Sequence, residues 1–343
     1  MTRLDACVRI EQFDPSADSQ SLRACFEMTS DGWPIDHPDT PPWSLRSFTG
    51  KWISGFGISP QRCWIATDDS GSAVGGYLLR LPEKENADRA GCELVVAPSR
   101  RRSGIGTALL RHCAEEARKA KRSWLRSHAD DASPGASFAA ASGARPGITD
   151  VQRVLAIGPG LPDRLAALRR SAEPHAAGYS LLSWSGVAPD EHLDDVARLN
   201  SAMADAPRDD GVQPTVWDAD RVRQVEQEIA DHGVRTDTVV ARDRGTGEIV
   251  ALTEICTEAD VPGWAFQMDT VVLPAHRGHR LGLLVKVAML ESLPDLGVPV
   301  ERIVTGNAGS NKYMIAINEQ LGFEVASTHR SWELDLTKPL AGA

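Results

Sequence analysis

The feature that most constrains this chain is an internal repeat in which matching residues lie 176 positions apart. The stretches "VVAPSRRRSGIG", from residue 95, and "VVLPAHRGHRLG", from residue 271, place a proline, an arginine and a glycine in the same order. The aligned pairs are Glu93 with Asp269, Pro98 with Pro274, Arg101 with Arg277, and Gly106 with Gly282. Several matches in one order indicate two copies of a single structural unit.

The segments around these stretches predict the architecture of each copy. Upstream, "CWIATDDSGSAVGGYLLRL" and "TVVARDRGTGEIVALTEI" are apolar runs around a glycine-containing turn, which is typical of a β-hairpin. Downstream, "DVQRVLAI" and "HRSWELDL" are predicted to be the last strands of the two copies. We therefore predict two tandem α/β folds, each a mixed, largely antiparallel sheet flanked by helices. The expected boundaries are an N-terminal domain over 1–160, a linker over 161–178 and a C-terminal domain over 179–343.

The composition narrows the classes of function. The net charge of -10 argues against nucleic-acid binding, and no apolar stretch is long enough to span a membrane. The first residues lack a secretory signal pattern and the six cysteines are scattered, so we expect a cytoplasmic protein with reduced thiols, monomeric or homodimeric. His276 and His279 have no close acidic or cysteine partner, so no metal site is expected. The acidic balance favours a cationic small molecule, or it serves solubility alone.

The glycines and arginines lie where a strand gives way to a helix. The first N–H groups of a helix have no intrahelical partner, and with the helix dipole they form an anion site. Glycine lets an anion approach the backbone, and arginine adds charge-assisted hydrogen bonds to phosphate. "RRSGIG" is therefore predicted to cradle a pyrophosphate, although the glycines could instead serve close packing of helix on sheet. The P-loop and dinucleotide fingerprints do not match.

The pattern V-x-P-x-x-R-x-x-G-I-G-x-x-L resembles the acyl-CoA signature of the GNAT superfamily of N-acyltransferases, and "NKYMIAINEQLGF" resembles its second motif. Both copies carry the pattern, so the chain is similar to tandem GNAT proteins of actinomycete type, which include mycothiol synthase. The resemblance implies that acetyl-CoA, or another acyl-CoA, lies in a gap between splayed strands and that an amine attacks the thioester directly. The implied cofactor-binding residues are Val95, Val96, Arg101, Arg102, Ser103, Gly104, Ile105, Gly106 and Thr107 in the first copy and Val271, Val272, Arg277, Gly278, His279, Arg280, Leu281, Gly282, Leu283, Asn307 and Asn311 in the second.

Two departures from the family pattern bear on which copy works. Arg280 stands where the first copy has Gly104, and its side chain either blocks the cradle or turns outward, where it could bind a phosphate of CoA. The family's proton-donating tyrosine is replaced by Asn318 in one copy and Ala139 in the other. An amide donates a hydrogen bond but gives up no proton at useful pH. The second copy keeps more of the motif, so it is the better candidate for catalysis.

A carboxylate beside the thioester could accept the proton of the acceptor amine. Asp269 holds that place in the second copy and Glu93 in the first, while Glu254 on the neighbouring hairpin strand competes with Asp269. Each of these carboxylates could instead be paired with an arginine or lie exposed on an edge.

The sequence thus favours an acetyl-CoA-dependent N-acyltransferase that acts on a small amine. Irregular stretches with Trp33, Trp43 and Trp217, and with Asp205, Asp209 and Asp210, would wall the acceptor pocket and receive a cation. Two alternatives remain open: a CoA-binding regulatory protein without turnover, and acyl transfer to the cysteine-bearing precursor of mycothiol.

Overall fold

The structure, a computed structural model, describes residues 8–55 and 59–340. The chain forms two compact units: unit 1 contains residues up to Thr149 together with the chain from Thr328 onward, and unit 2 runs from Asp150 to Ser327. These limits differ from the expected boundaries at 160 and 178. Cys7 lies outside the described residues, and the other five cysteines are free and buried. No helix in the described ranges is long and apolar enough to cross a membrane.

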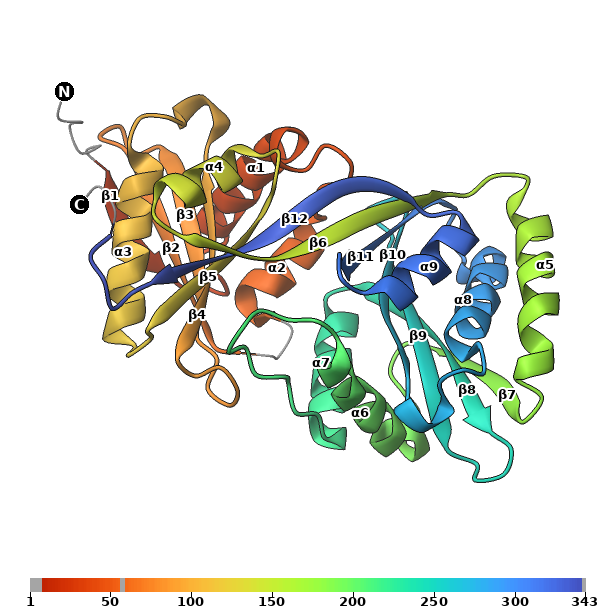
Figure 1. Cartoon of the computed structure of the whole chain (residues 1–343). Coiled ribbons are helices and arrows are strands. Elements are labelled where there is room, and N and C mark those ends of the chain that lie inside the picture. The colour runs from red at the N-terminus through yellow and green to blue at the C-terminus, as the bar shows by residue number, and fades with distance from the viewer. Residues whose placement is uncertain (1–7, 56–58, 341–343) are drawn as a thin grey trace. The chain divides into compact units, whose positions relative to one another are not determined.

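Unit 1 is a sheet with helices on its faces (Figure 1). Its strands follow the order β1-β2-β3-β4-β5-β12, and only the β4–β5 pair is parallel among those whose register is known. The elements are β1 (Arg9–Phe13), α1 (Ser19–Asp36), α2 (Leu45–Ile53), β2 (Gln61–Thr67), β3 (Ala73–Arg80), β4 (Arg89–Val96), the 3-10 turn η2 (Pro98–Arg100), α3 (Ile105–Lys119), β5 (Trp124–Asp130), α4 (Pro134–Ala141) and the end of β12 (Glu324–Asp335).

Unit 2 repeats this plan with the strand order β6-β11-β10-β9-β8-β7. Its elements are the end of β6 (Arg145–Ala156), α5 (Leu161–Ala172), η3 (Glu173–His175), β7 (Tyr179–Ser185), η4 (Asp190–His192), α6 (Leu193–Ala202), η5 (Met203–Asp205), α7 (Ala219–Asp231), β8 (Val234–Asp243), β9 (Ile249–Glu258), β10 (Gly263–Val272), η6 (Pro274–His276), α8 (Leu281–Glu291), η7 (Leu293–Leu296), β11 (Val300–Ala308) and α9 (Lys312–Leu321). Both predicted hairpins are present, as β2–β3 and β8–β9.

The predicted last strands form, but each pairs within the other unit. Residues 150–156 of β6 pair with β11 in unit 2, and residues 329–335 of β12 pair with β5 in unit 1. The last strand of each copy therefore joins the sheet of the other copy. Residues 161–178 are likewise no simple linker, because α5 buries Leu161, Leu165 and Ala172 in the core of unit 2. The physical reason is that an amphipathic helix must bury its apolar face, and α8 offers a matching surface.

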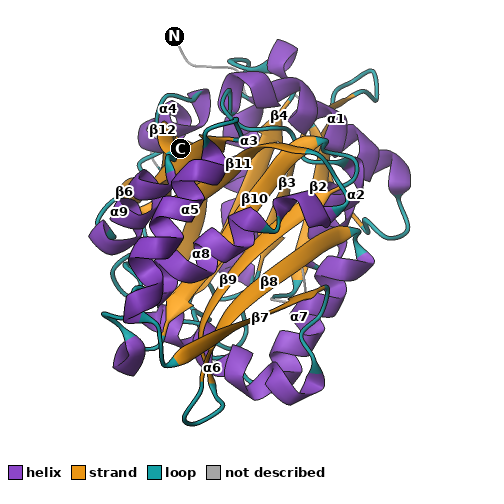
Figure 2. Cartoon of the chain, turned by 90° about the vertical axis from the view of Figure 1, so that its right-hand side faces the viewer, coloured by secondary structure: helices purple, strands orange, loops and turns teal. Residues whose placement is uncertain are grey.

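The two faces of the unit 2 sheet carry different helices (Figure 2). On one face α8, which is largely apolar and buried, packs with α5 over Ala251, Ile255 and Ala265. On the other face α6 and α7 pack over Leu252 and Val271. Because side chains alternate along a strand, neighbouring residues of β9 and β10 face different helices. This alternation decides which residues of these strands can meet.

Candidate active site

The two strand–helix loops have the same backbone shape. In unit 1, Arg102 and Gly104 have positive φ angles of 67° and 91°, and in unit 2, Gly278 and Arg280 have values of 88° and 55°. These positions correspond under the repeat, with arginine and glycine exchanged. No side chain caps the first turn of α3 or α8, so their first amides stay available to a ligand. Both units thus have the uncapped helix start that the predicted anion cradle requires.

Gly106 and Gly282, in the first turns of α3 and α8, are only weakly required by the packing of helix on sheet. A Cβ at Gly106 would lie 3.5 Å from Phe138 and 3.7 Å from Val96, which is ordinary contact. A Cβ at Gly282 would lie 3.3 Å from the end of Ile317, which needs a shift of only a few tenths of an ångström. Alanine would nearly fit at both positions. Close packing of helix on sheet is therefore a weaker explanation than an approach of ligand to the backbone.

Arg101 and Arg277 hold the loops in place. Their Nε atoms donate to the carbonyl groups that end the preceding strands, Val96 at 3.3 Å and Val272 at 3.2 Å. The guanidinium of Arg101 also forms a bidentate ion pair with Asp36, at 3.0 and 2.7 Å. That of Arg277 bonds to Asp205 at 2.8 Å, so this aspartate does not stand free for a cationic acceptor. The two arginines therefore fasten each loop to its strand, and a contact with pyrophosphate would require these ion pairs to open.

The other predicted cradle residues differ in how far their side chains are exposed. Ile105, Leu281 and Leu283 are buried in the cores, so only their backbone groups can reach a ligand. Arg280 turns toward α5, where its Nη1 lies 3.2 Å from the hydroxyl of Ser171, and therefore leaves the helix start open. His279 bonds through Nδ1 to the carbonyl of His175. The remaining exposed side chains at the loops belong to Arg102 and Ser103, and Thr107 is half-buried.

Both units contain the expected splayed pair of parallel strands. In unit 1, β4 pairs with β5 only over Arg89–Gly91, and Val95 and Val96 lie beyond the last pair. In unit 2, β10 pairs with β11 from Gly263 to Gln267, and Val271 and Val272 lie beyond it. Backbone groups on the open sides of these strands can bind an extended chain, as an added strand would. The gap expected for a pantetheine arm is present twice.

The pairing of β10 with β9 is broken by a β-bulge at the splay. Gln267 pairs with Ile255 and Thr270 pairs with Thr253, so Met268 and Asp269 together oppose the single residue Glu254. Glu254 lies two residues after Leu252, and Asp269 two before Val271. Both carboxylates therefore face the α6–α7 side of the sheet. The bulge brings the two rival base candidates of the sequence together.

The electrostatic environment keeps these carboxylates basic. The pKa of Glu254 is raised to about 8, chiefly by loss of solvation and also by repulsion from the neighbouring Asp269 and Glu226. Loss of solvation also raises the pKa of Asp269. Part of this residue is nevertheless exposed to solvent. Within residues 8–55 and 59–340, neither carboxylate has a hydrogen bond or ion pair. Glu226, on α7, was missed from the sequence because nothing in the repeat marks it.

Glu93, at the matching position of unit 1, is neutralised. Its carboxylate lies 2.6 Å from Nζ of Lys51 and also contacts the guanidinium of Arg80. β4 pairs with β3 in unbroken register through this residue, so unit 1 has no bulge here. The ion-paired alternative is the one observed, and Glu93 would have to break two ion pairs to act as a base.

Asn318 does not replace the missing tyrosine. It is fully buried on α9, and its Nδ2 donates to Oδ1 of Asn307 on β11 at 2.6 Å. Asn311 caps α9 by accepting a hydrogen bond from the amide of Met314. Asn318 thus holds Asn307 beside the splayed gap, and the predicted hydrogen bond to a leaving thiolate has no support in this geometry.

The predicted acceptor loops are only partly free. Trp33 donates to the carbonyl of Thr40, Trp43 lies under Lys51, and Trp217 lies beside Arg221. Asp209 is buried and Asp210 exposed, and both have partners. No metal-binding group of histidine, cysteine or carboxylate side chains occurs in the described part of the chain. His276 instead bonds to the hydroxyl of Tyr179.

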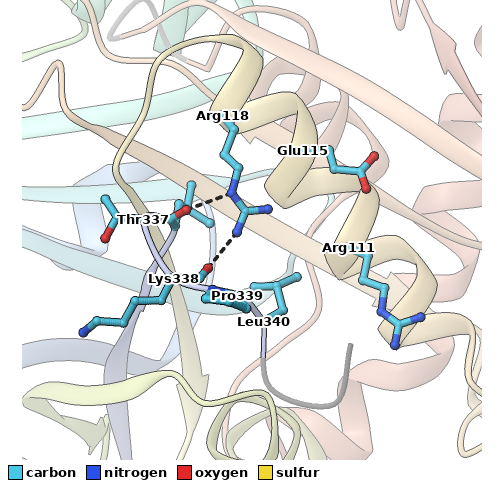
Figure 3. Close-up of a pocket in the computed structure, with 8 residues that line it drawn as sticks. Arg111, Glu115, Arg118, Thr337, Lys338, Pro339 and Leu340 are labelled. Carbon is cyan, nitrogen blue, oxygen red and sulfur yellow. Dashed lines mark hydrogen bonds between the residues drawn. The ribbon is translucent and has the colours of Figure 1, made fainter.

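A surface pocket of unit 1 lies apart from all of these residues (Figure 3). It is lined by Arg111, Glu115, Arg118, Leu336, Thr337, Lys338, Pro339 and Leu340. Arg118 crosses it and donates to the carbonyl groups of Leu336 and Lys338, so its charge is used to tie the C-terminal segment to α3. No predicted site residue lines this pocket.

Two copies of a sheet with a splayed strand pair and an uncapped helix start are the arrangement that the resemblance to GNAT acyltransferases predicted. Residues 22–136 match the family described as "Acetyltransferase (GNAT) family". Over nearly its whole length the chain is similar to a solved tandem GNAT protein. The matched residues belong to unit 1, whereas the unpaired carboxylates lie in unit 2.

Relatives extend the resemblance over both units. A protein named mycothiol acetyltransferase, from Mycobacteroides abscessus, is 28% identical over 267 residues, which are 77% of this chain and 82% of the relative. A solved structure titled "Tandem GNAT protein from the clavulanic acid biosynthesis pathway" has a TM-score of 0.80 at 28% identity, with 97% of this chain and 99% of the other covered. A GCN5-related N-acetyltransferase from Sphaerobacter thermophilus shares the fold, with a TM-score of 0.66 at 16% identity over 97% and 96% of the two chains.

Proposed function

We propose that this chain transfers the acetyl group of acetyl-CoA to the nitrogen of a small, cationic amine and that unit 2 catalyses the reaction. The observation that carries the proposal is the pair of unpaired carboxylates at the bulge of β10, beside the open end of the β10–β11 pair. We place the reaction in the cytoplasm.

The division of labour follows from the geometry of unit 2. The amides at the start of α8 would hold the diphosphate of CoA, and the side of the Val271 and Val272 backbone that faces away from β9 would align its pantetheine arm. Met268 and Asp269 leave the β-ladder at the bulge, so a backbone N–H there can polarise the thioester carbonyl.

Proton transfer falls to the carboxylates. An amine acceptor arrives as an ammonium ion and must lose a proton before its nitrogen attacks. Glu254, with a pKa of about 8, can accept that proton in its ionised form, whose population grows as the pH rises toward and past 8, directly or through water beside Asp269. The new carbon–nitrogen bond then forms as the carbon–sulfur bond breaks, and the second proton lost by the nitrogen passes through water to the CoA thiolate. Because CoA thiolate is a stable leaving group, no tyrosine is required.

The cluster of Glu226, Glu254 and Asp269 also supports a cationic acceptor. No cation pairs with the last two in the described chain, so a bound ammonium would supply the missing counter-charge. Unit 1 differs: its cradle is complete but its carboxylate is neutralised, which favours binding of CoA without turnover there.

The test is release of CoA thiol from acetyl-CoA in the presence of a panel of amines. Diamines, amino acids, amino sugars and the cysteine-bearing precursor of mycothiol would each be offered. We expect release that depends on one class of amine and the N-acetylated product by mass spectrometry. Release with the mycothiol precursor alone would assign the relative's named activity to this chain. Stoichiometric CoA binding without release for any amine would refute the enzymatic proposal.

A further inference from the structure

Polar residues lie beneath the bulge where the core is otherwise apolar. Thr253 is fully buried and Gln267 is 5% exposed. Thr253 lies between Ala251 and Ile255 on the α8 face of β9, and Gln267 follows Ala265 on the same face of β10. Apolar side chains would be stabilising there, and a polar group is tolerated only when it is hydrogen-bonded. Thr253, Gln267 and Thr270 hydrogen-bond to one another around the bulge.

The hydrogen bonds bracket the bulge on both sides. Nε2 of Gln267 donates to Oγ1 of Thr253 at 3.0 Å and to the carbonyl of Glu254 at 2.5 Å. Oγ1 of Thr253 shares a hydrogen bond with Oγ1 of Thr270 at 2.7 Å. Gln267 forms the last regular pair before the bulge and Thr270 the first after it. Thr253 therefore ties the two ends of the bulge together.

Resting on the proposed function, we propose that Thr253, Gln267 and Thr270 form a clamp that fixes the bulge and thereby aims Glu254 and Asp269 at the acceptor. They are positioning residues, because they lie on the opposite face of the sheet from the two carboxylates. The Glu254 carbonyl held by Gln267 belongs to the same residue as the candidate base. Slippage of the clamp would return β10 to regular pairing and turn Asp269 away.

The clamp contains an uncompensated polar atom, which argues that it serves more than stability. A carbonyl only accepts, so Nε2 of Gln267 must face Glu254, and this orientation leaves Oε1 buried without a partner among the described residues. A buried acceptor without a partner destabilises the folded state, because its desolvation is not compensated. A site that keeps such a group bears the cost for geometry.

Unit 1 lacks the clamp and the bulge together. The residues 176 positions before Thr253, Gln267 and Thr270 are Tyr77, Gly91 and Leu94. Tyr77 bonds to His112 on α3 instead, and β3 and β4 stay in regular register. The same fold therefore runs straight through this position when the three polar residues are absent.

Substitution of Thr253 tests the clamp. Thr253→Val keeps the shape and removes the hydroxyl, whereas Thr253→Ser keeps the hydroxyl. We expect Thr253→Val to lower kcat about tenfold or more, with the KM for acetyl-CoA within about twofold, and Thr253→Ser to restore kcat. Thr257→Val, a buried threonine on the same strand and face, is the matched control with kcat unchanged. If Thr253→Val fails to fold, Thr270→Val carries the same test.

A second readout separates the clamp from the proposed reaction. Carbon-13 NMR of the carboxyl groups reports the titration of Glu254, assigned by its loss in Glu254→Gln. Asp269 from β10 and Glu226 from α7 are the charged groups that face it. We expect Thr253→Val to move its midpoint down from about 8 toward the ordinary range, because Asp269 turns away. An unchanged midpoint together with an unchanged kcat would overturn the clamp. If the wild type acetylates no amine, the NMR titration alone decides.

Discussion

Units 1 and 2 differ in the electrostatic environment of one equivalent carboxylate, which is Glu93 in unit 1 and Asp269 in unit 2. In unit 1, Glu93 lies in a regular strand between Lys51 and Arg80, and in unit 2, Asp269 lies in a bulge beside Glu254 with no cation. The cradles at the adjoining helices have the same backbone shape in both units. Ligand binding and proton transfer are therefore separable properties of this fold. Under the proposed function, unit 1 retains ligand binding alone, whereas unit 2 combines ligand binding with proton transfer.

The largest effect is expected when each cradle is filled in turn. Gly282→Trp places an indole over the first amides of α8 and should reduce turnover below detection, because acetyl-CoA can no longer reach unit 2. Gly106→Trp, its matched partner in unit 1, should remove one equivalent of bound CoA and leave turnover in place. Calorimetric titration with CoA and the thiol-release assay measure both. Loss of turnover with Gly106→Trp alone would transfer catalysis to unit 1. Circular dichroism must show both variants folded.

Removal of the candidate base should produce the next largest effect. Glu254→Gln should lower kcat by about 10²–10⁴, and the rise of kcat with pH through about 8 should disappear, because the amide cannot accept a proton. Asp269→Asn should flatten the same rise less completely. Glu93→Gln is the control and should leave the pH profile unchanged, since its carboxylate is ion-paired. A normal profile in Glu254→Gln would assign the base to Asp269 or to solvent.

The repeat and the cradles were predictable from sequence because they depend on local chemistry. Proline, glycine and arginine act through backbone conformation and helix ends, which short motifs specify. The exchange of β6 and β12 between the units was not predictable, since either last strand has the same apolar alternation and could close either sheet. The pairing of Glu93 was left open for a similar reason. Lys51 lies 42 positions away on α2, and only the packed structure brings it near.

The bulge shows a subtler limit of sequence analysis. The sequence placed Asp269 and Glu254 as rivals, since regular alternation gives no sign that two residues of β10 oppose one of β9. Thr253, Gln267 and Thr270 were not recognised, although polar residues in otherwise apolar strands were a visible signal. Glu226 lay beyond any motif and depends on the docking of α7.

The raised pKa of Glu254 predicts a measurable effect on stability. The folded protein keeps this carboxyl protonated up to about pH 8, whereas the unfolded chain releases the proton above about 4.5. Folding therefore takes up a proton between these values, and this residue's contribution to stability declines as pH rises through that window. Glu254→Gln should raise the melting temperature by about 3 °C or more at pH 8.5 and leave it unchanged near pH 4. An equal shift at both pH values would show that electrostatics is not the cause.

The smallest expected effect concerns the exchanged residue in the two loops. Arg280 has a φ of 55°, and a residue with a Cβ costs about 1–2 kcal/mol in this region, whereas Gly104 bears no such strain in unit 1. Arg280→Gly should raise the melting temperature by about 1–3 °C, and Gly104→Arg should lower it. Because Arg280 turns to Ser171 and away from the amides of α8, Arg280→Gly should leave the KM for acetyl-CoA within about twofold. A tenfold rise in that KM would instead assign Arg280 to a phosphate of CoA, and the two loops would then differ in ligand contacts as well as in strain.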